Sequence, residues 1–160
     1  MDDLSLEPFN FPDFSFRVRA SGQSKQIYDS VRKRFVALTP EEWVRQNLLC
    51  FMEQVFAYPV SRMAVEKRVE VNGLSQRADV VVYNGFGLPC LVAECKAASV
   101  KITEETFLQA ARYNLGLNVP FYVLTNGLEH FCMKWVDNSF VFLDELPTLA
   151  DLEAWTGSPS

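Results

Sequence analysis

The chain has 160 residues, of which 49% are hydrophobic and 22% are charged, and this length and apolar content predict one globular domain with a single sizeable core. The composition excludes a disordered chain and a collagen-like repeat, because 7 Gly and 8 Pro are too few and the apolar fraction is too high. A total of 15 basic and 20 acidic residues gives a net charge of −5, so any site for a polyanion must be a local basic patch.

Residues 1–38 predict an N-terminal β-arm or hairpin that packs on the rest of the domain. Gly22 predicts a turn that brings a strand over residues 14–19 back against residues 26–28. The basic run at 32–34 has two interpretations, a patch that contacts phosphates or an ordinary solvated charge run. The segment begins acidic and lacks the pattern of a secretory signal, which predicts a cytoplasmic protein.

Residues 39–145 predict the main fold, which begins with a helix and a β-hairpin. Thr39 is a good helix cap and Pro40 suits the first helical turn, so we expect a helix over residues 40–57. The dipeptide Asn72-Gly73 is a strong hairpin signal, and it joins predicted strands over residues 63–71 and 76–83.

The rest of the predicted core continues the sheet. We expect a third strand over residues 88–97, a helix over 104–117, and strands over 120–125 and 130–136. This order predicts an α/β fold with a mixed central sheet flanked by helices. Residues 146–160 predict a short helix or a loose tail. No apolar stretch approaches the ~20 residues that cross a bilayer, so we expect no membrane partner.

The cysteines predict reduced, structural thiols. They lie in apolar stretches without CxxC spacing, and the single histidine, His130, is near only one of them, so a zinc site is not expected. The four are Cys50, Cys90, Cys95 and Cys132.

The chemistry of the chain is suggested by charges inside central strands, where a charge is costly unless it is paired or bound to a metal. Because side chains alternate along a strand, Glu94 and Lys96 share one face of the third strand, and Arg77 and Asp79 share one face of the second. If the strands align them, the four charges converge. Two close carboxylates repel each other, and Mg²⁺ or Mn²⁺ is the natural partner for such a pair.

A cation on this pair beside a lysine is an arrangement that can hydrolyse a phosphodiester. The alternative is a buried salt bridge between Asp79 or Glu94 and Lys96 or Arg77, with no catalysis. The short D…ExK spacing leaves both interpretations open.

Two stretches, Arg77–Tyr83 (RADVVVY) and Leu91–Ala97 (LVAECKA), resemble the PD-(D/E)xK nuclease superfamily and, within it, the N-terminal nuclease-like domain of type I restriction enzyme R subunits. The segments 38–46, 109–114 and 124–127 resemble the same group. The resemblance covers residues 16–136 and implies a restriction-endonuclease-like αβββαβ core.

The resemblance also implies a site and a reaction. Asp79 and Glu94 would be metal ligands and Lys96 the catalytic lysine of a magnesium-dependent deoxyribonuclease. Glu42 matches an additional acidic ligand, although it also stands where a capping-box glutamate belongs. Gln109 and Tyr113 lie four residues apart on one helix face and resemble a Q-x-x-x-Y element beside the metal, which orients nucleic acid. A packed tyrosine that hydrogen-bonds Gln109 is the alternative.

Other cations are candidates for binding DNA. Arg77, Lys101 and Arg112 are expected to contact nucleic acid, in a track that could include Arg17, Arg19, Lys25 and Lys33. The sequence contains no helicase or specificity region, so any DNA translocation or sequence recognition either comes from a motor or specificity partner on another chain or does not exist, and a homodimer is possible. The alternative function is a catalytically silent nucleic-acid-binding or assembly module. A purely structural domain, in which Lys96 pairs with a carboxylate, is a third interpretation.

Overall fold

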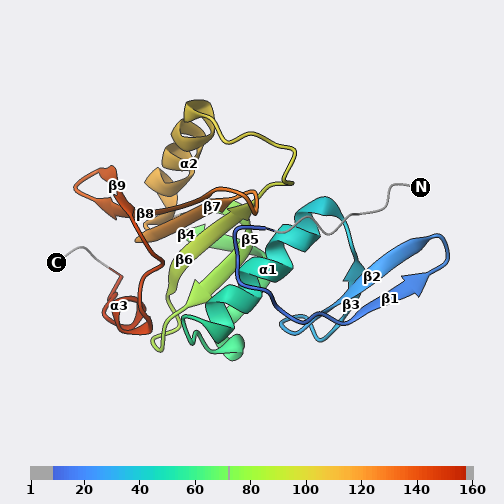
Figure 1. Cartoon of the computed structure of the whole chain (residues 1–160). Coiled ribbons are helices and arrows are strands. Elements are labelled where there is room, and N and C mark those ends of the chain that lie inside the picture. The colour runs from blue at the N-terminus through green and yellow to red at the C-terminus, as the bar shows by residue number, and fades with distance from the viewer. Residues whose placement is uncertain (1–8, 72, 158–160) are drawn as a thin grey trace.

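The computed structural model describes residues 9–71 and 73–157, and for residues 71, 74, 111 and 113–117 it describes the backbone alone. Its centre is a six-stranded mixed sheet with the strands in the order β4-β5-β6-β7-β8-β9 (Figure 1). Only the β6–β7 pair is parallel among these neighbours. The strands are β4 (Met63–Val71), β5 (Leu74–Tyr83), β6 (Pro89–Cys95), β7 (Phe121–Thr125), β8 (His130–Val136) and β9 (Ser139–Leu143).

The two long helices cover different faces of this sheet. On one face α1 (Pro40–Gln54) packs through Leu48 and neighbouring apolar residues against Val80 and Leu91. On the other face α2 (Glu104–Leu117) packs through Ala110 against the side of Val81 and Val92. Alternate residues of β5 and β6 therefore enter two separate cores, which is why both strands are apolar on both faces. A one-turn η1 (Val60–Arg62) and a short α3 (Leu149–Glu153) complete the helices described.

The N-terminal arm is a separate three-stranded antiparallel sheet on the α1 side of the molecule (Figure 1). Its strands are β1 (Val18–Ser21), β2 (Ser24–Asp29) and β3 (Arg34–Ala37). The predicted turn at Gly22 is present, and the glycine adopts a φ of 62°, which an L residue rarely takes. The predicted first strand at 14–19 was wrong in its bounds, and β3 was not predicted.

The mixed α/β sheet expected from the sequence is confirmed, with differences at several ends. The helix predicted over 40–57 ends at Gln54, and a left-handed φ of 58° at Ala57 then turns the chain away from the helical path. The expected hairpin of β4 and β5 is present, although Asn72 lies outside the described residues. An additional edge strand, β9, pairs with β8 where no strand was expected. No helix in the described part of the chain is long and apolar enough to span a bilayer.

Replacing Thr39 with alanine is expected to lower the free energy of unfolding by about 1 kcal/mol, as for other helix N-caps. The hydroxyl oxygen of Thr39 accepts a hydrogen bond from the backbone N–H of Glu42 at 3.1 Å, and alanine leaves that N–H without its partner. Urea denaturation of Thr39→Ala beside the exposed control Thr156→Ala measures the difference. Equal losses in the two variants would show that the cap contributes nothing.

Candidate active site

A row of three carboxylates crosses three adjacent strands, in the middle of β4 and β5 and near the end of β6. The pairs Val65↔Val80 and Lys67↔Ala78 place Glu66 opposite Asp79, and the β5–β6 register continues the row to Glu94. Glu66 adopts a left-handed φ of 52°, which is unusual for a non-glycine residue inside a strand. Glu66 was not among the predicted site residues.

The hairpin changes face at this row. Val65 and Val80 contact the core on the α1 side, whereas Val69 and Ala78, further toward the hairpin tip, contact the core on the α2 side. Glu66 and Asp79 therefore lie at the point where the inward-facing side chains of the hairpin switch from the α1 core to the α2 core. The left-handed φ of Glu66 is part of this change.

Asp79 is held from two sides. Its Oδ2 accepts a hydrogen bond from the Cys95 backbone N–H at 2.8 Å, and its Oδ1 lies 4.0 Å from Nη1 of Arg45. Burial raises the pKa of Asp79, and the charge of Glu94 adds to this effect, while Cys95, Arg45 and Lys96 oppose it. The carboxylate is thus oriented, yet its ionised form is disfavoured.

Glu94 forms the second part of the site on β6. Its Oε1 lies 2.7 Å from the Lys96 Nζ, and its Oε2 accepts a hydrogen bond from the Tyr122 hydroxyl at 2.6 Å. The predicted shared face of Glu94 and Lys96 is therefore confirmed. Tyr122 enters from the neighbouring parallel strand β7, a contact that the sequence analysis missed.

Arg77 takes a different partner from the one expected. Its Nη2 lies 3.0 Å from Oε2 of Glu66, and 61% of its side chain is exposed. Arg77 thus neutralises the outer end of the carboxylate row, and among the described ion pairs it contacts Glu66 rather than Asp79.

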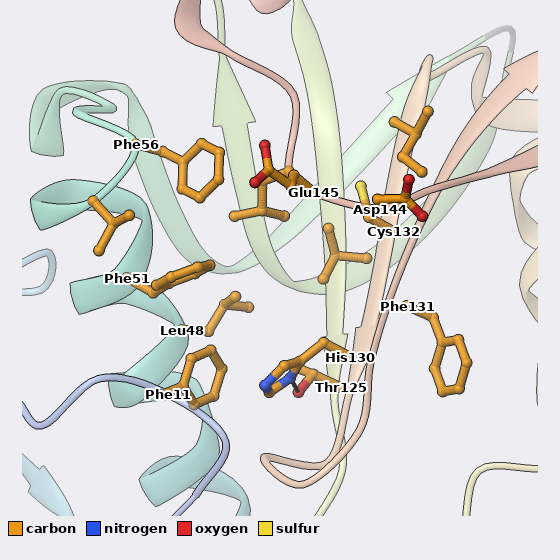
Figure 2. Close-up of a pocket in the computed structure, with 14 residues that line it drawn as sticks. Phe11, Leu48, Phe51, Phe56, Thr125, His130, Phe131, Cys132, Asp144 and Glu145 are labelled. Carbon is orange, nitrogen blue, oxygen red and sulfur yellow. Dashed lines mark hydrogen bonds between the residues drawn. The ribbon is translucent and has the colours of Figure 1, made fainter.

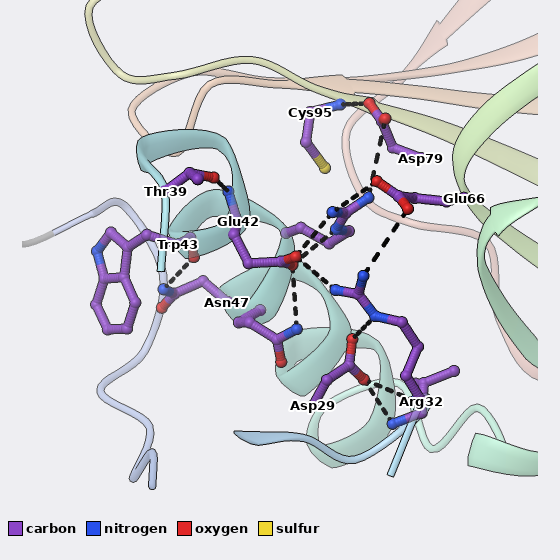
Figure 3. A network of polar contacts seen from close by, with 12 residues as sticks. Asp29, Arg32, Thr39, Glu42, Trp43, Asn47, Glu66, Asp79 and Cys95 are labelled. Atoms are coloured by element: carbon purple, nitrogen blue, oxygen red, sulfur yellow. Dashed lines mark hydrogen bonds and ion pairs between the residues drawn. The ribbon is translucent and has the colours of Figure 1, made fainter. Parts of the chain in front are cut away.

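A buried ion-pair network lies beside the row and centres on Glu42 (Figure 3). Arg45 donates to both carboxylate oxygens of Glu42 at 2.8 Å, Gln46 donates at 3.3 Å, and Arg32 forms a further short contact. Burial works against ionisation of Glu42, but the hydrogen bonds and charges of Arg45 and Arg32 outweigh it and lower the pKa of this carboxyl group. The carboxylate therefore serves neither as a capping-box acceptor nor as an open ligand in this structure.

The same network links the arm to the carboxylate row. In the arm, Asp29 is fully buried and pairs with Arg32 at 2.6 Å. Arg32 then contacts Glu42, and Arg45 lies 3.5 Å from Glu66 as well as near Asp79. Alternating charges thus run from β2 through α1 to β4 and β5.

Residues 40–147 match the protein family described as type I restriction enzyme R protein N terminus. The chain belongs to this family. A solved fragment of a protein assigned as an HsdR subunit of a type I restriction enzyme from Vibrio vulnificus YJ016 has a similar fold, with a TM-score of 0.52 and 19% identity. The similarity covers 72% of this chain and only 24% of that one. No curated protein matches the chain.

The metal ligands predicted for this R-protein N-terminal domain differ in how well they suit a cation. Asp79 and Glu94 supply hard oxygen donors on neighbouring strands, and a cation would relieve the repulsion that contributes to the raised pKa of Asp79. Both oxygens of Glu42 are engaged by arginine and glutamine side chains. Within residues 9–71 and 73–157, no group of three His, Cys, Asp or Glu side chains is arranged to hold a metal. Of the three predicted ligands, Asp79 and Glu94 lie on adjacent strands beside Lys96, whereas Glu42 lies within the arginine network.

The other predicted residues lie on and near α2. Lys101, Gln109 and Arg112 are exposed, while Ala110 of the same helix faces the core. The side chain of Tyr113 lies outside the described residues, so its role remains a prediction, as do the roles of the other three.

An apolar cavity of about 350 Å³ lies on the α1 side of the sheet, and none of the carboxylates of the row lines it (Figure 2). Its walls include Phe11 and Phe51, and the ring of Phe11 lies 4.2 Å from that of His130. Burial lowers the pKa of His130, partly offset by its hydrogen bond with the Asn10 carbonyl, so the ring favours its neutral form.

Proposed function

We propose that this R-protein N-terminal domain is a PD-(D/E)xK nuclease that hydrolyses DNA phosphodiesters with Mg²⁺ or Mn²⁺. The order α1-β4-β5-β6-α2-β7 is consistent with the αβββαβ core of that superfamily. The observation that carries the proposal is the position of Asp79 and Glu94 side by side on the adjacent strands β5 and β6, with Lys96 ion-paired to Glu94.

The chain's own residues pre-organise this site. The Cys95 N–H fixes one oxygen of Asp79, and the Tyr122 hydroxyl fixes one oxygen of Glu94, so neither carboxylate has to be ordered when the ligand arrives. Asp79 and Glu94 would hold the cation, which when bound supplies an activated water and neutralises charge on the phosphate.

Lys96 has the role of orienting water and phosphate beside these carboxylates. Glu94 Oε1 keeps its ammonium group at 2.7 Å, and 35% of the lysine side chain is exposed, so the charge is reachable from solvent. An ammonium near the developing charge of a phosphodiester transition state stabilises it electrostatically. We assign the orientation of nucleic acid to Gln109 and Tyr113 on α2, as the family resemblance implies.

Lys96→Gln is expected to reduce metal-dependent cutting by about a hundredfold or more, the typical effect of removing one electrostatic contact to the transition state. Supercoiled plasmid and single-stranded circular DNA are incubated with the full chain in Mg²⁺ or Mn²⁺, and the products are resolved on gels. Lys134→Gln, an exposed cation on β8, is the matched control. Equal cutting by the two variants would remove Lys96 from the site.

A second function, a catalytically silent module that binds nucleic acid or assembles with a motor or specificity chain, is favoured by a different observation. The described oxygens of Glu42 and Glu94 already have protein partners, as in a buried structural ion-pair system. No cutting by the parent chain in either metal, together with salt-sensitive DNA binding, would support this function.

A further inference from the structure

The N-terminal arm carries a charge opposite to that of the rest of the chain. Residues 17–37 contain six basic residues and one acidic residue, which gives a net charge of +5. Since the whole chain has a net charge of −5, the remaining residues have a net charge of −10. The arm lies outside residues 40–147, which match the R-protein family. Its charge is therefore a feature of this chain in addition to the family domain.

One face of the arm combines cations with aromatic rings. The register of β1 with β2 and of β2 with β3 places Arg19, Gln26, Tyr28 and Phe35 on the same face. Arg19 lies 3.9 Å above the centre of the Phe35 ring, and its Nε donates to Gln26 at 2.8 Å. Arg17 lies 4.6 Å above the Tyr28 ring. We call these residues, with Arg17, the outer face of the arm.

The opposite face of the arm fixes it to the domain. Ile27 and Asp29 of β2 are fully buried, and Asp29 connects through Arg32 to Glu42 of α1. Arg32 is therefore paired with carboxylates inside the protein. The other cations of the arm are exposed and make no ion pair among the described residues: Arg17, Arg19, Lys25, Lys33 and Arg34.

We propose that the outer face of the arm is a DNA-binding surface that grips the phosphate backbone through Arg17 and Arg19. A guanidinium that stacks on an aromatic ring is held in place while its N–H edges remain available for bidentate contacts with phosphate. The arm as a whole has a net charge of +5 on an otherwise acidic chain, so it attracts a polyanion to the surface that carries Arg17 and Arg19.

The position of the arm suits this role. A groove between the arm and the domain is lined by Gln26 and Phe35 of the outer face on one side and by Glu42, Arg45 and Glu66 on the other. The outer face thus borders the network that leads to Asp79. The inference rests on the proposed function in taking DNA as the ligand, but it does not require cleavage.

The test compares two double variants with the same change in charge. We measure binding of the full chain by fluorescence anisotropy, with a labelled duplex of ~20 base pairs and with the matching single strand. The titrations are done in EDTA at several salt concentrations. Arg17→Gln/Arg19→Gln is expected to weaken binding by at least about tenfold and to reduce the salt slope by about 2, one counter-ion for each lost contact. Arg68→Gln/Lys134→Gln removes two exposed cations from β4 and β8 and should change binding far less.

The variant Arg17→Lys/Arg19→Lys keeps the charge but loses the planar stacked groups. Its salt slope should therefore equal that of the parent chain, while its affinity should stay below that of the parent. The relative affinities for duplex and single strand show which form of DNA the arm binds through its phosphate backbone. Equal weakening by the two glutamine pairs, or no binding by the parent at low salt, would overturn the inference. Because EDTA prevents cutting, a chain that binds through the arm but never cuts plasmid contradicts only the proposed function.

Discussion

Replacing Glu42 with alanine is expected to lower the free energy of unfolding by about 3–5 kcal/mol, the usual result of removing one partner from a buried ion pair. The variant leaves Arg32 and Arg45 with their charges largely buried and without the carboxylate that both contact. It also loosens the connection between the arm and α1. Urea denaturation followed by circular dichroism measures the change.

The control is Glu53→Ala, which removes an exposed carboxylate from the same helix and should change stability by less than about 0.5 kcal/mol. Both variants are measured in EDTA and in Mg²⁺. A loss of stability that is the same in the two solutions supports a structural Glu42, whereas a loss that appears only in Mg²⁺ would support the predicted ligand role.

The pH dependence provides a second readout for the network. The pKa values of Glu42 and Asp29 are lowered in the folded state, so the stability from their ionisation is present above the ordinary carboxyl pKa and is lost as the pH falls through the lowered values. The difference between parent and Glu42→Ala should therefore shrink as the solution is acidified. A difference that stays constant into acid would contradict the network as the cause.

The main elements could be predicted because each depends on local sequence. Helical spacing and the Thr39 cap predicted α1, and the expected bounds of α2 and β8 agree with the structure. Strand alternation placed Glu94 and Lys96 on one face, and their ion pair confirms it. Such features need only neighbouring residues.

Glu66 could also have been found in the sequence. A two-residue turn at Asn72-Gly73 fixes the hairpin register, and counting outward from it pairs residue 66 with residue 79. The turn signal at Asn72-Gly73 therefore already implies an acidic residue directly opposite Asp79.

The partners of the site could not be predicted, because they depend on how distant elements pack. Tyr122 reaches Glu94 only since β7 lies beside β6, after a crossover that includes α2. Arg32 reaches Glu42 only since the arm folds back against α1. In each case sequence patterns predict the element but not which of its polar side chains meets a given charge.

Replacing Asp79 with asparagine is expected to slow metal-dependent cutting severely while raising the melting temperature. Loss of one cation ligand should lower the rate by about a thousandfold, which corresponds to ~4 kcal/mol of transition-state stabilisation. Asparagine keeps an oxygen that can accept the hydrogen bond from Cys95 and removes a charge that burial and Glu94 disfavour. Plasmid cleavage and thermal denaturation in EDTA measure the two effects, with the exposed Asp144→Asn as the control.

The direction of the stability change follows from the raised pKa of Asp79. A carboxyl group whose pKa is raised by folding binds its proton more tightly in the folded state, so its ionisation costs stability as the pH rises through the ordinary and then the raised pKa. The gain from asparagine should therefore be full near neutral pH and vanish in acid. A variant that is less stable than the parent would mean that Asp79 is a structural partner of Arg45. A more stable variant without activity is the result expected of a residue retained for chemistry at a cost to the fold.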